Sequence, residues 1–220
     1  MLPKGAISKH SVKRGPALRE RMLHAAKAVF LEVGFERASM DRIAAHAGTT
    51  KRTLYAHFGR KEDLFFAVFE LVLGLQLHHL GQPADYAPDP LSALVLFCVR
   101  FLQTVLSSRP LRLFRLAIAE TDRFPENGTV RLHEALLESV EARIAEHLAA
   151  HYGLPPAESQ ATARRLLGQL LYPRFTRALF GATEPAVAQS DELGGSPAVD
   201  AEAVRHLLAA SLPPANASEA

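Results

Sequence analysis

The chain has 220 residues and a formal charge of +2, so it is long enough for one or two domains that bury their own cores. The charge is unevenly distributed: residues 1–70 hold thirteen Lys and Arg against seven Asp and Glu, a net +6, which leaves −4 for the other 150 residues. A basic first third favours a nucleic-acid surface at one end and argues against a uniformly basic protein. The single cysteine, Cys98, excludes an internal disulfide framework and is typical of a reducing compartment.

The N-terminal residues are polar and basic and lack the apolar core of a secretory signal peptide, which predicts a cytoplasmic protein. We expect residues 1–16 to form a flexible arm that either follows DNA or is only a solubilising tail. Ala17–Val33 is predicted to be a helix with a continuous apolar face. Gly34 is expected to end this helix, and Phe35 to pack back on its last turn.

Residues 39–58 have the pattern of two short helices joined by a tight turn. Ser39 is the expected N-cap of the first helix, and Gly48 stands where a left-handed residue ends it. Thr49 or Thr50 is expected to cap the second helix. The first helix carries one apolar stripe at helical spacing: Met40, Ile43, Ala44 and Ala47.

The second short helix has two different faces. Leu54 and Phe58, four residues apart, form the inward face. The outward face combines cations, hydroxyls and an aromatic ring and has no carboxylate: Lys51, Arg52, Thr53, Tyr55, Ala56 and His57. Such a face is typical of a helix whose first residues contact base edges in the major groove while its neighbours hold phosphates. The alternative is a solvated basic face on an ordinary helical hairpin.

The rest of the chain is predicted to be helical too. The apolar run 64–80 has only seventeen residues and includes Glu70 and Gln76, fewer than the roughly 20 apolar residues of a membrane span, so we expect a buried helix connecting two domains and no membrane partner. Residues 81–90 and 182–197 are predicted loops. No strand-like alternation appears, so the predicted fold class is all-α with about nine helices. The remaining predicted helices are 91–108, 109–124, 126–152, 157–180 with a kink at Pro173, and 199–212.

No motif typical of an enzyme is present, whether a nucleophile motif, a glycine-rich phosphate loop or paired carboxylates in an apolar setting. His147 and His151 have the i, i+4 spacing of a metal pair, but they have no evident third ligand and are expected to be surface histidines. Cys98, between Phe97 and Phe101, is expected to be a buried structural thiol. We therefore predict no catalysis, no metal and no cofactor.

Two functions are expected of the C-terminal part. The first is an apolar ligand pocket with Arg115 or Glu120 as its polar anchor, although its aromatic residues equally fit a core; they are Phe97, Phe101, Phe114 and Tyr172. The second is dimerisation of the last large helix and the short terminal helix as a four-helix bundle. This prediction depends on apolar side chains that otherwise need a partner: Leu166, Leu167, Leu170, Leu171, Val204, Leu207 and Leu208.

The run AGTTKRTLYAHFGRKEDLF, preceded by VFLEVGFERASMDRIA, resembles the DNA-binding domain of the TetR family of bacterial transcriptional regulators. The resemblance covers Ala17 to about Phe69. It implies a homodimer that binds a palindromic operator as a repressor and releases it when a small molecule fills the C-terminal domain. It also implies a phosphate contact by Lys61 and DNA contacts by Thr50, Lys51, Thr53, Tyr55 and His57.

Four further positions separate this chain from the common pattern of that family or add to it. Arg52 stands at a variable position, often glycine, and is predicted to read a base, namely a guanine edge. Arg42, on the outer face of the first short helix, completes the predicted DNA-binding set. Thr49 stands where many members have valine. Arg60 replaces a common serine cap, which predicts a less well capped helix after it.

The run FRLAIAETDRFPENG, Phe114 to Gly128, resembles the C-terminal domain of the AefR-like branch of the same family over about residues 91–181. It supports a dimeric regulator but names no effector. The predicted organisation is an arm at 1–16, a helix-turn-helix domain at 17–62, an effector-binding and dimerisation domain at 63–213, and a disordered tail at 214–220. A ligand-independent DNA-binding regulator and a helical carrier or enzyme are the alternatives.

Overall fold

The computed structural model describes residues 14–120, 128–185 and 199–214. Within these ranges the chain forms ten α-helices and one 3₁₀ helix and no strand, which confirms the all-α prediction. Four predicted segments lie wholly or mostly outside the described residues. They are the arm except for its last residues, the end of the 109–124 helix, most of the 182–197 loop and most of the tail. The chain divides into two compact units, Met1–Leu71 and Val72–Ala220.

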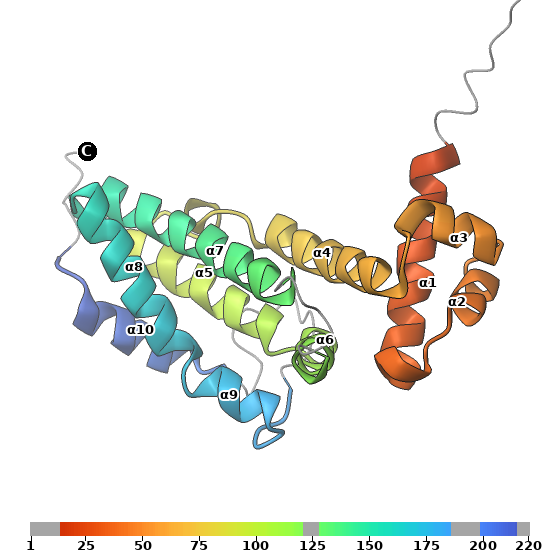
Figure 1. The fold of residues 1–220 in the computed structure, drawn as a ribbon. Helices are drawn as coiled ribbons and strands as arrows, with labels where there is room; N and C mark the ends of the chain where they lie inside the picture. The colour runs from red at the N-terminus through yellow and green to blue at the C-terminus, as the bar shows by residue number, and fades with distance from the viewer. Residues whose placement is uncertain (1–13, 121–127, 186–198, 215–220) are drawn as a thin grey trace, which may run out of the picture. The chain divides into compact units, whose positions relative to one another are not determined.

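Four helices build the N-terminal unit: α1 (Arg14–Arg37), α2 (Met40–His46), α3 (Lys51–Phe58) and the first half of α4 (Lys61–Leu80), with α2 and α3 beside α1 (Figure 1). Gly34 has φ 79° and ψ 169°, so the helical path of α1 is interrupted there. Phe35 consequently turns back, and its ring stacks on that of Phe30 with centroids 5.7 Å apart. Phe65 of α4 packs edge-on against both rings, at 5.3 and 5.4 Å. The predicted helix end and the packing of Phe35 are confirmed.

The turn between α2 and α3 has the predicted caps. The hydroxyl of Ser39 accepts a hydrogen bond from the backbone N–H of Arg42 at 3.2 Å. Gly48 has φ 61°, a left-handed conformation that glycine adopts without a Cβ clash. The hydroxyl of Thr50 accepts from the backbone N–H of Thr53 at 3.1 Å, so Thr50 and not Thr49 caps α3.

Helix α4 is long and apolar enough to cross a bilayer by length and composition, with a mean hydropathy of 1.3. A core helix of a globular protein passes the same test. Its residues Leu64, Phe65 and Val68 are fully buried in the N-terminal unit, as the sequence predicted for this segment. The two units divide within this helix, after Leu71, whereas the predicted boundary between residues 62 and 63 lies in its first turn. The first half of α4 belongs to the N-terminal unit because it completes the core of α1.

The C-terminal unit consists of the second half of α4, a 3₁₀ turn (Pro83–Asp85) and six helices. In it, α7 packs along α8, and α10 lies against α5 (Figure 1). Cys98 on α5 is 1 % exposed, and burial raises the pKa of its thiol to about 12, which confirms a structural cysteine. The six helices are α5 (Pro90–Val105), α6 (Ser108–Ala119), α7 (Gly128–Tyr152), α8 (Pro156–Leu171), α9 (Arg174–Leu179) and α10 (Ala201–Ser211).

The predicted kinked helix over 157–180 is wrong, because the chain forms two helices, α8 and α9, with an extended residue between them. Tyr172 has φ −89° and ψ 133°. A residue that precedes proline is disfavoured in the helical region by contact with the proline ring. Pro173 also has no backbone N–H to continue the ladder of α8. The helix therefore ends at Leu171 and a new one starts at Arg174.

The prediction that His147 is a surface histidine is wrong as well. His147 is only 6 % exposed, and its Nε2 lies 2.9 Å from the carbonyl oxygen of Pro90. Burial lowers the pKa of His147, and the neighbouring His151 lowers it further, against the hydrogen bond to Pro90. No group of three or more potential metal ligands occurs among the described residues.

The apolar side chains that were expected to need a dimer partner are mostly buried within one chain. Leu166 and Leu170 of α8 are fully buried, as are Val204 and Leu208 of α10, and Leu167 is 4 % exposed. Leu171 and Leu207 are half-buried. The argument for dimerisation from these residues is therefore wrong, because α7 and α5 already cover them.

Candidate nucleic-acid interface

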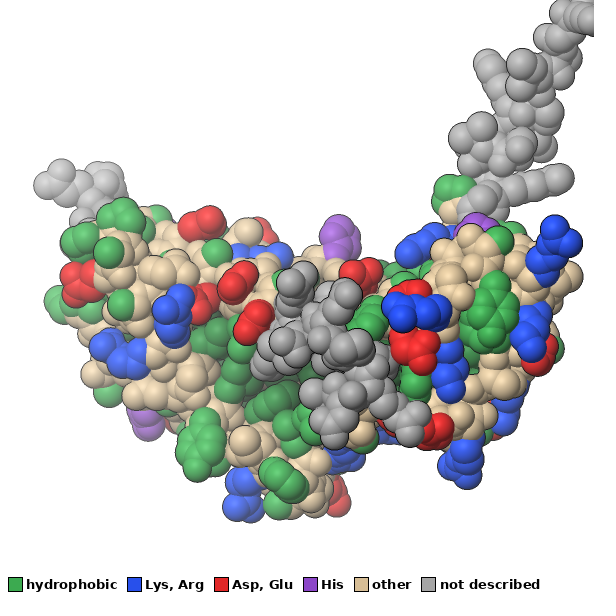
Figure 2. All heavy atoms as spheres, in the orientation of Figure 1, with side chains coloured by type: hydrophobic (Ala, Val, Ile, Leu, Met, Phe, Trp, Pro, Cys, Tyr) green, Lys and Arg blue, Asp and Glu red, His purple; other side chains and the backbone are tan. Residues whose placement is uncertain are grey.

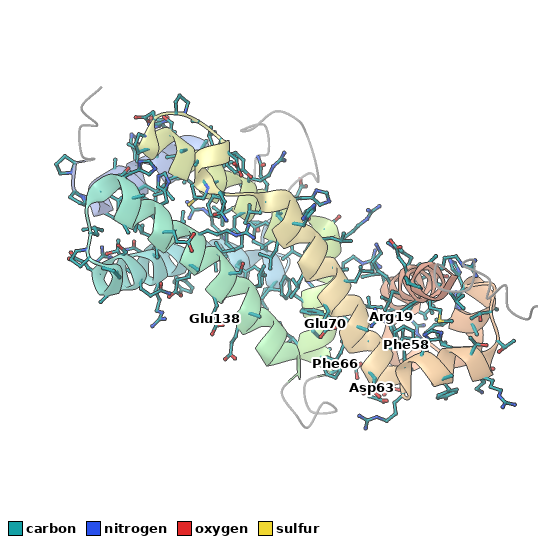
Figure 3. The ribbon with its side chains drawn as sticks, turned by 90° about the horizontal axis from the view of Figure 1, so that it is seen from above. Arg19, Phe58, Asp63, Phe66, Glu70 and Glu138 are labelled. Carbon is teal, nitrogen blue, oxygen red and sulfur yellow. The ribbon has the colours of Figure 1, made fainter. Side chains whose placement is uncertain are left out.

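Helix α3 and its N-cap present most of the predicted DNA-binding residues to solvent, whereas Arg42 lies on α2 and Lys61 at the start of α4. Leu54 is fully buried and Phe58 is 7 % exposed, and together they fix the inward side of the helix. The guanidinium of Arg19 from α1 lies over the ring of Phe58, with its Cζ 5.3 Å from the ring centroid (Figure 3). Since α1 holds α3 from the inside, the opposite face is directed to solvent. The exposed or half-buried residues there are Thr50, Lys51, Arg52, Thr53, Tyr55 and His57.

Two of these residues have local structural roles in the free protein. The hydroxyl oxygens of Thr50 and Thr53 lie 2.7 Å apart in a hydrogen bond, in addition to the cap that Thr50 provides. The hydroxyl of Thr50 holds the first turn of α3 in place, because it accepts a hydrogen bond from a backbone N–H of that turn. Tyr55 is 43 % exposed, so its ring and hydroxyl are accessible at the centre of the helix.

Two cations next to this face are paired with carboxylates. Nζ of Lys51 lies 2.7 Å from Oδ2 of Asp41, and Nη2 of Arg42 lies 2.6 Å from Oε1 of Glu32. The hydrogen bond that Lys51 donates to Asp41, together with the negative charge of that carboxylate, raises the pKa of Lys51. In Figure 2 several exposed Lys and Arg side chains of this unit, at the right of the view, lie next to Asp or Glu side chains.

Lys61 has partners that its sequence position did not reveal. Its ammonium donates to the carbonyl oxygens of Phe35 and Ala38, at 3.0 and 3.2 Å, and lies 3.5 Å from that of Glu36. It also stands 4.3 Å from the centroid of the Phe35 ring. The side chain is half-buried and joins the start of α4 to the end of α1. A phosphate contact by Lys61 remains a prediction, and this geometry favours a role in holding the unit together.

The start of α4 has one half of a capping box, although Arg60 replaces the common serine cap. Oδ2 of Asp63 accepts from the backbone N–H of Arg60 at 3.2 Å, the reciprocal half of a capping box. The guanidinium of Arg60 donates to both oxygens of the same carboxylate, at 3.2 and 3.1 Å. Asp63, labelled in Figure 3, therefore fixes Arg60 at the start of α4, but it does not replace a serine hydroxyl, which would accept from the first amides of the helix itself.

The predicted ligand-binding residues do not come together around one pocket. Phe97, Phe101 and Phe114 are buried at 0, 2 and 6 % exposure, whereas Tyr172 is 71 % exposed and cannot line an interior cavity. Nε of Arg115 donates to the carbonyl of Leu179 at 2.7 Å and its Nη2 to that of Ala178, so it caps the end of α9.

The space between these aromatic residues is small. Phe101 and Phe114 border a cavity of about 10 Å³, room for roughly one water molecule. This favours the core interpretation over the ligand-pocket interpretation for both residues. The other residues that line the cavity are Leu73, Leu77, Leu80, Thr104, Val105, Pro110 and Leu136.

Two features of the C-terminal unit escaped the sequence analysis. A half-open hollow of about 360 Å³ lies beside the break between α8 and α9, and only recognition of that break could have indicated it. Its lining residues are Leu106, Pro173, Arg174, Arg177, Ala178, Thr183 and Glu184. Separately, Gln103 on α5 is 6 % exposed, and its amide nitrogen has no hydrogen-bond partner within the described residues. No sequence pattern marks such a group.

A short capped helix held by its inner face against a scaffold helix, with cations and an exposed tyrosine outside, defines a helix-turn-helix regulator. Family models agree with this class. Residues 22–68 match the bacterial regulatory proteins of the tetR family, and residues 92–210, more than half of the chain, match the AefR-like transcriptional repressor C-terminal domain. The chain is therefore a member of the TetR family of transcriptional regulators with an AefR-like C-terminal domain, and not an enzyme.

Individual relatives resemble the N-terminal part. The chain is 44 % identical over 52 residues to the transcriptional activator FasR of Mycolicibacterium smegmatis, covering 24 % of either chain. It is 31 % identical over 99 residues to the regulator AcrR of Shigella flexneri, covering 43 % of this chain and 45 % of that protein. It is 36 % identical over 77 residues to the repressor BepR of Brucella suis, covering 34 and 37 %. The chain thus matches less than half the length of these relatives.

Solved structures match over nearly the whole chain, at sequence identities that establish the fold alone. A TetR-family protein of Mesorhizobium loti superposes with a TM-score of 0.69 at 24 % identity, covering 90 % of this chain and 94 % of that one. NalD of Pseudomonas aeruginosa, the secondary repressor of the MexAB-OprM multidrug efflux pump, gives 0.56 at 21 % identity, covering 91 and 98 %. The fatty acid degradation regulator FadR of Bacillus halodurans gives 0.59 at 16 %, covering 86 and 96 %.

Proposed function

We propose that this protein is a homodimeric repressor that binds a palindromic operator in the cytoplasm. The observation that supports the proposal most directly is α3, whose exposed outer face has no carboxylate of its own and is held from inside by Leu54 and Phe58. Two copies of α3 enter successive major grooves about 34 Å apart. The AefR-like repressor match of the C-terminal half favours repression over activation.

The outer face divides into base-reading and phosphate-holding residues. Arg52 reads a guanine edge, with Thr53 and Tyr55 beside it, because these side chains lie on the first turns of a helix that enters the groove. The phosphates are held by Lys51 and Arg42, together with Thr50 and His57 at the edges of the face. Base contacts set the sequence preference, whereas phosphate contacts set register and general affinity.

The proposed dimer uses the outer faces of α8 and α10 and not their buried leucines. On α8 the exposed face includes Ala157, Ala161 and Gly168, whose small side chains permit close approach of a second helix. On α10 it includes His206 and Ala210. Light scattering on the eluting protein should give twice the chain mass of 24.0 kDa. A monomer at micromolar concentration would contradict this part of the proposal.

We propose further that a small-molecule effector binds the C-terminal unit and lowers operator affinity. The unpartnered amide of Gln103 supports this, because a buried donor without an acceptor costs free energy that a ligand or a water molecule recovers. An effector that prefers the dimer with a different spacing of its two α3 helices shifts the population away from the DNA-bound form.

A regulator without an effector is the second candidate function, and the small cavity at Phe101 and Phe114 favours it. Thermal unfolding against a panel of metabolites and drugs separates the two, since a compound that binds the folded state raises the Tm. No stabilising compound, together with constant operator affinity, would support the ligand-independent regulator.

The central experiment is selection of genomic DNA fragments by the purified protein, followed by titration of the selected operator and a random duplex at two ionic strengths. We expect a palindromic sequence, tighter binding to it than to random DNA, and loss of affinity with salt. Absence of any salt-dependent duplex affinity would contradict the proposal.

A further inference from the structure

The cations next to α3 are not equivalent in the free protein. Arg42 of α2 and Lys51 of α3 each meet a carboxylate from the preceding helix, Glu32 of α1 and Asp41 of α2, at 2.6 and 2.7 Å. All four side chains are exposed, from 45 to 67 %. The side chain of Arg52, on the same face, has no hydrogen bond or ion pair with another described residue. The paired cations are those assigned to phosphates, and the unpaired one is assigned to a base.

We propose that Asp41 and Glu32 are built-in competitors of the DNA backbone, which hold Lys51 and Arg42 and so lower the affinity for every duplex, whatever its sequence. This inference rests on the proposed function, because it assumes that Lys51 and Arg42 contact phosphates. It assigns two acidic residues outside the predicted DNA-binding set to the control of binding.

The physical argument has two parts. On binding, a phosphate must replace the carboxylate at each cation, so the new charge-assisted hydrogen bond is offset by the loss of an existing one. The released carboxylate then remains close to the negatively charged backbone, where like charges repel. Both effects act on phosphate contacts, which supply the sequence-independent share of affinity.

The consequence is a division of labour on one surface. Non-specific binding depends almost entirely on phosphate contacts, so the competitors weaken it directly. Discrimination between bases remains with Arg52, which no carboxylate engages within the described residues. Such a protein spends less time on random DNA without any change in the bases that it prefers.

The test is a double-mutant cycle of Asp41→Asn and Lys51→Met, read as affinity for a random duplex and for the selected operator over a salt series. We expect Asp41→Asn to tighten binding to both duplexes by about two- to fivefold, the range for one exposed ion pair, and least at high salt. Lys51→Met should lower the slope of log K against log salt concentration by roughly one. In the Lys51→Met background, the gain from Asp41→Asn should shrink to the smaller part that comes from removing a negative charge near the DNA backbone.

Glu20→Gln is the matched control, because it removes one negative charge from α1, and among the described side chains the carboxylate of Glu20 is paired with His24 alone, at 3.8 Å. Its gain should be clearly smaller than that of Asp41→Asn. Glu32→Gln, paired with Arg42→Met in a second cycle, provides the same test should Asp41→Asn disturb the folding of α2.

Two results overturn the inference: unchanged random-duplex affinity in Asp41→Asn and Glu32→Gln, or gains that persist fully after removal of the partner cation. Either result leaves the proposed function intact, because the wild-type protein still binds DNA. A wild-type protein with no salt-dependent duplex affinity would overturn the inference and the proposed function together.

Discussion

Helices α3 and α8 both carry apolar side chains at helical spacing, yet the sequence predicts the surroundings of these side chains correctly in α3 and wrongly in α8. In α3 the buried residues Leu54 and Phe58 leave the polar side chains outside, and the proposed DNA contacts are made by those polar side chains. In α8 the function was assigned to leucines, and Leu166 and Leu170 are fully buried by the same chain. An apolar stripe predicts that a face is covered, but it does not identify what covers it.

The largest expected effect tests whether the two units are separate. Leu54→Ala removes a fully buried side chain from α3 and should lower the free energy of unfolding of the N-terminal unit by about 2–5 kcal/mol. Urea unfolding followed by circular dichroism should then show an earlier first transition. Cys98 in the other unit should stay unreactive toward a thiol reagent through that transition, because it is 1 % exposed with a thiol pKa of about 12.

Exposure of Cys98 in step with the first transition of Leu54→Ala would contradict this separation. It would mean that the C-terminal unit cannot remain folded once α3 has lost its inner contact. Leu166→Ala, a fully buried leucine of α8, is the matched variant for the other unit and should instead advance the exposure of Cys98.

The next effect distinguishes a structural lysine from one that contacts DNA. Lys61→Met leaves the carbonyls of Phe35 and Ala38 without this donor and should destabilise the N-terminal unit by about 1–3 kcal/mol. The salt dependence of the DNA affinity should not change. Lys51→Met should do the reverse, with an unchanged Tm and a slope of log K against log salt lowered by roughly one.

A Lys61→Met protein with a normal Tm and a lower salt slope would return Lys61 to the phosphate contact that its sequence position implies. Calorimetric unfolding and anisotropy titrations on the same preparations decide between the two roles. The comparison is sharp because both variants replace one lysine near the start of a helix by a side chain of similar length.

Arg52→Ala tests the base-reading half of the proposed interface. Removal of a bidentate contact to guanine should weaken operator binding by about 1–3 kcal/mol and relax the preference at one base pair. Binding to random duplex should change much less. Lys51→Met is the contrast, since loss of a phosphate contact should weaken both duplexes alike. Equal losses on operator and random DNA for Arg52→Ala would contradict its assignment to a base.

The smallest expected effect is a pH dependence in the C-terminal unit. The pKa of His147 is lowered by burial, so in the folded protein it stays neutral below the pKa of about 6.5 that an unfolded histidine has. Between these two pKa values the unfolded state binds more protons, and stability therefore falls as pH drops below that of unfolded histidine. His147→Gln should flatten this dependence in urea titrations at a series of pH values, and an unchanged profile would contradict it.

Local chemistry made much of the N-terminal unit predictable. Ser39, Gly48 and Thr50 act through hydrogen bonds and dihedral angles within four residues of themselves, so their roles follow from sequence spacing. The carboxylate-free face of α3 likewise follows from the position of Leu54 and Phe58. Asp41 and Glu32 did not stand out, because each meets a cation ten residues away across a turn.

Long-range packing made the C-terminal unit harder to predict. Tyr172 was placed in a pocket because it is aromatic. Its position before Pro173 gives it an extended backbone between α8 and α9, and its side chain is 71 % exposed. His147 was placed on the surface because no third metal ligand was evident, but the carbonyl oxygen of Pro90, 57 residues away, accepts a hydrogen bond from its Nε2 and allows its burial. Neither outcome has a signal within the neighbouring residues.

The sequence by itself determined the all-helical fold and the helix-turn-helix with its caps and exposed cations, since these depend on periodicity and on contacts between near neighbours. It also determined the family, through the resemblance of the run from Ala47 to Phe65 to TetR-family regulators. Only the tertiary structure decided that Lys61 joins α1 to α4, that Leu166 and Val204 belong to one chain's core, and that Lys51 and Arg42 are held by carboxylates. The reason is physical: a side chain's partner is set by which helices pack together, and the same leucine or lysine is compatible with several partners until they do.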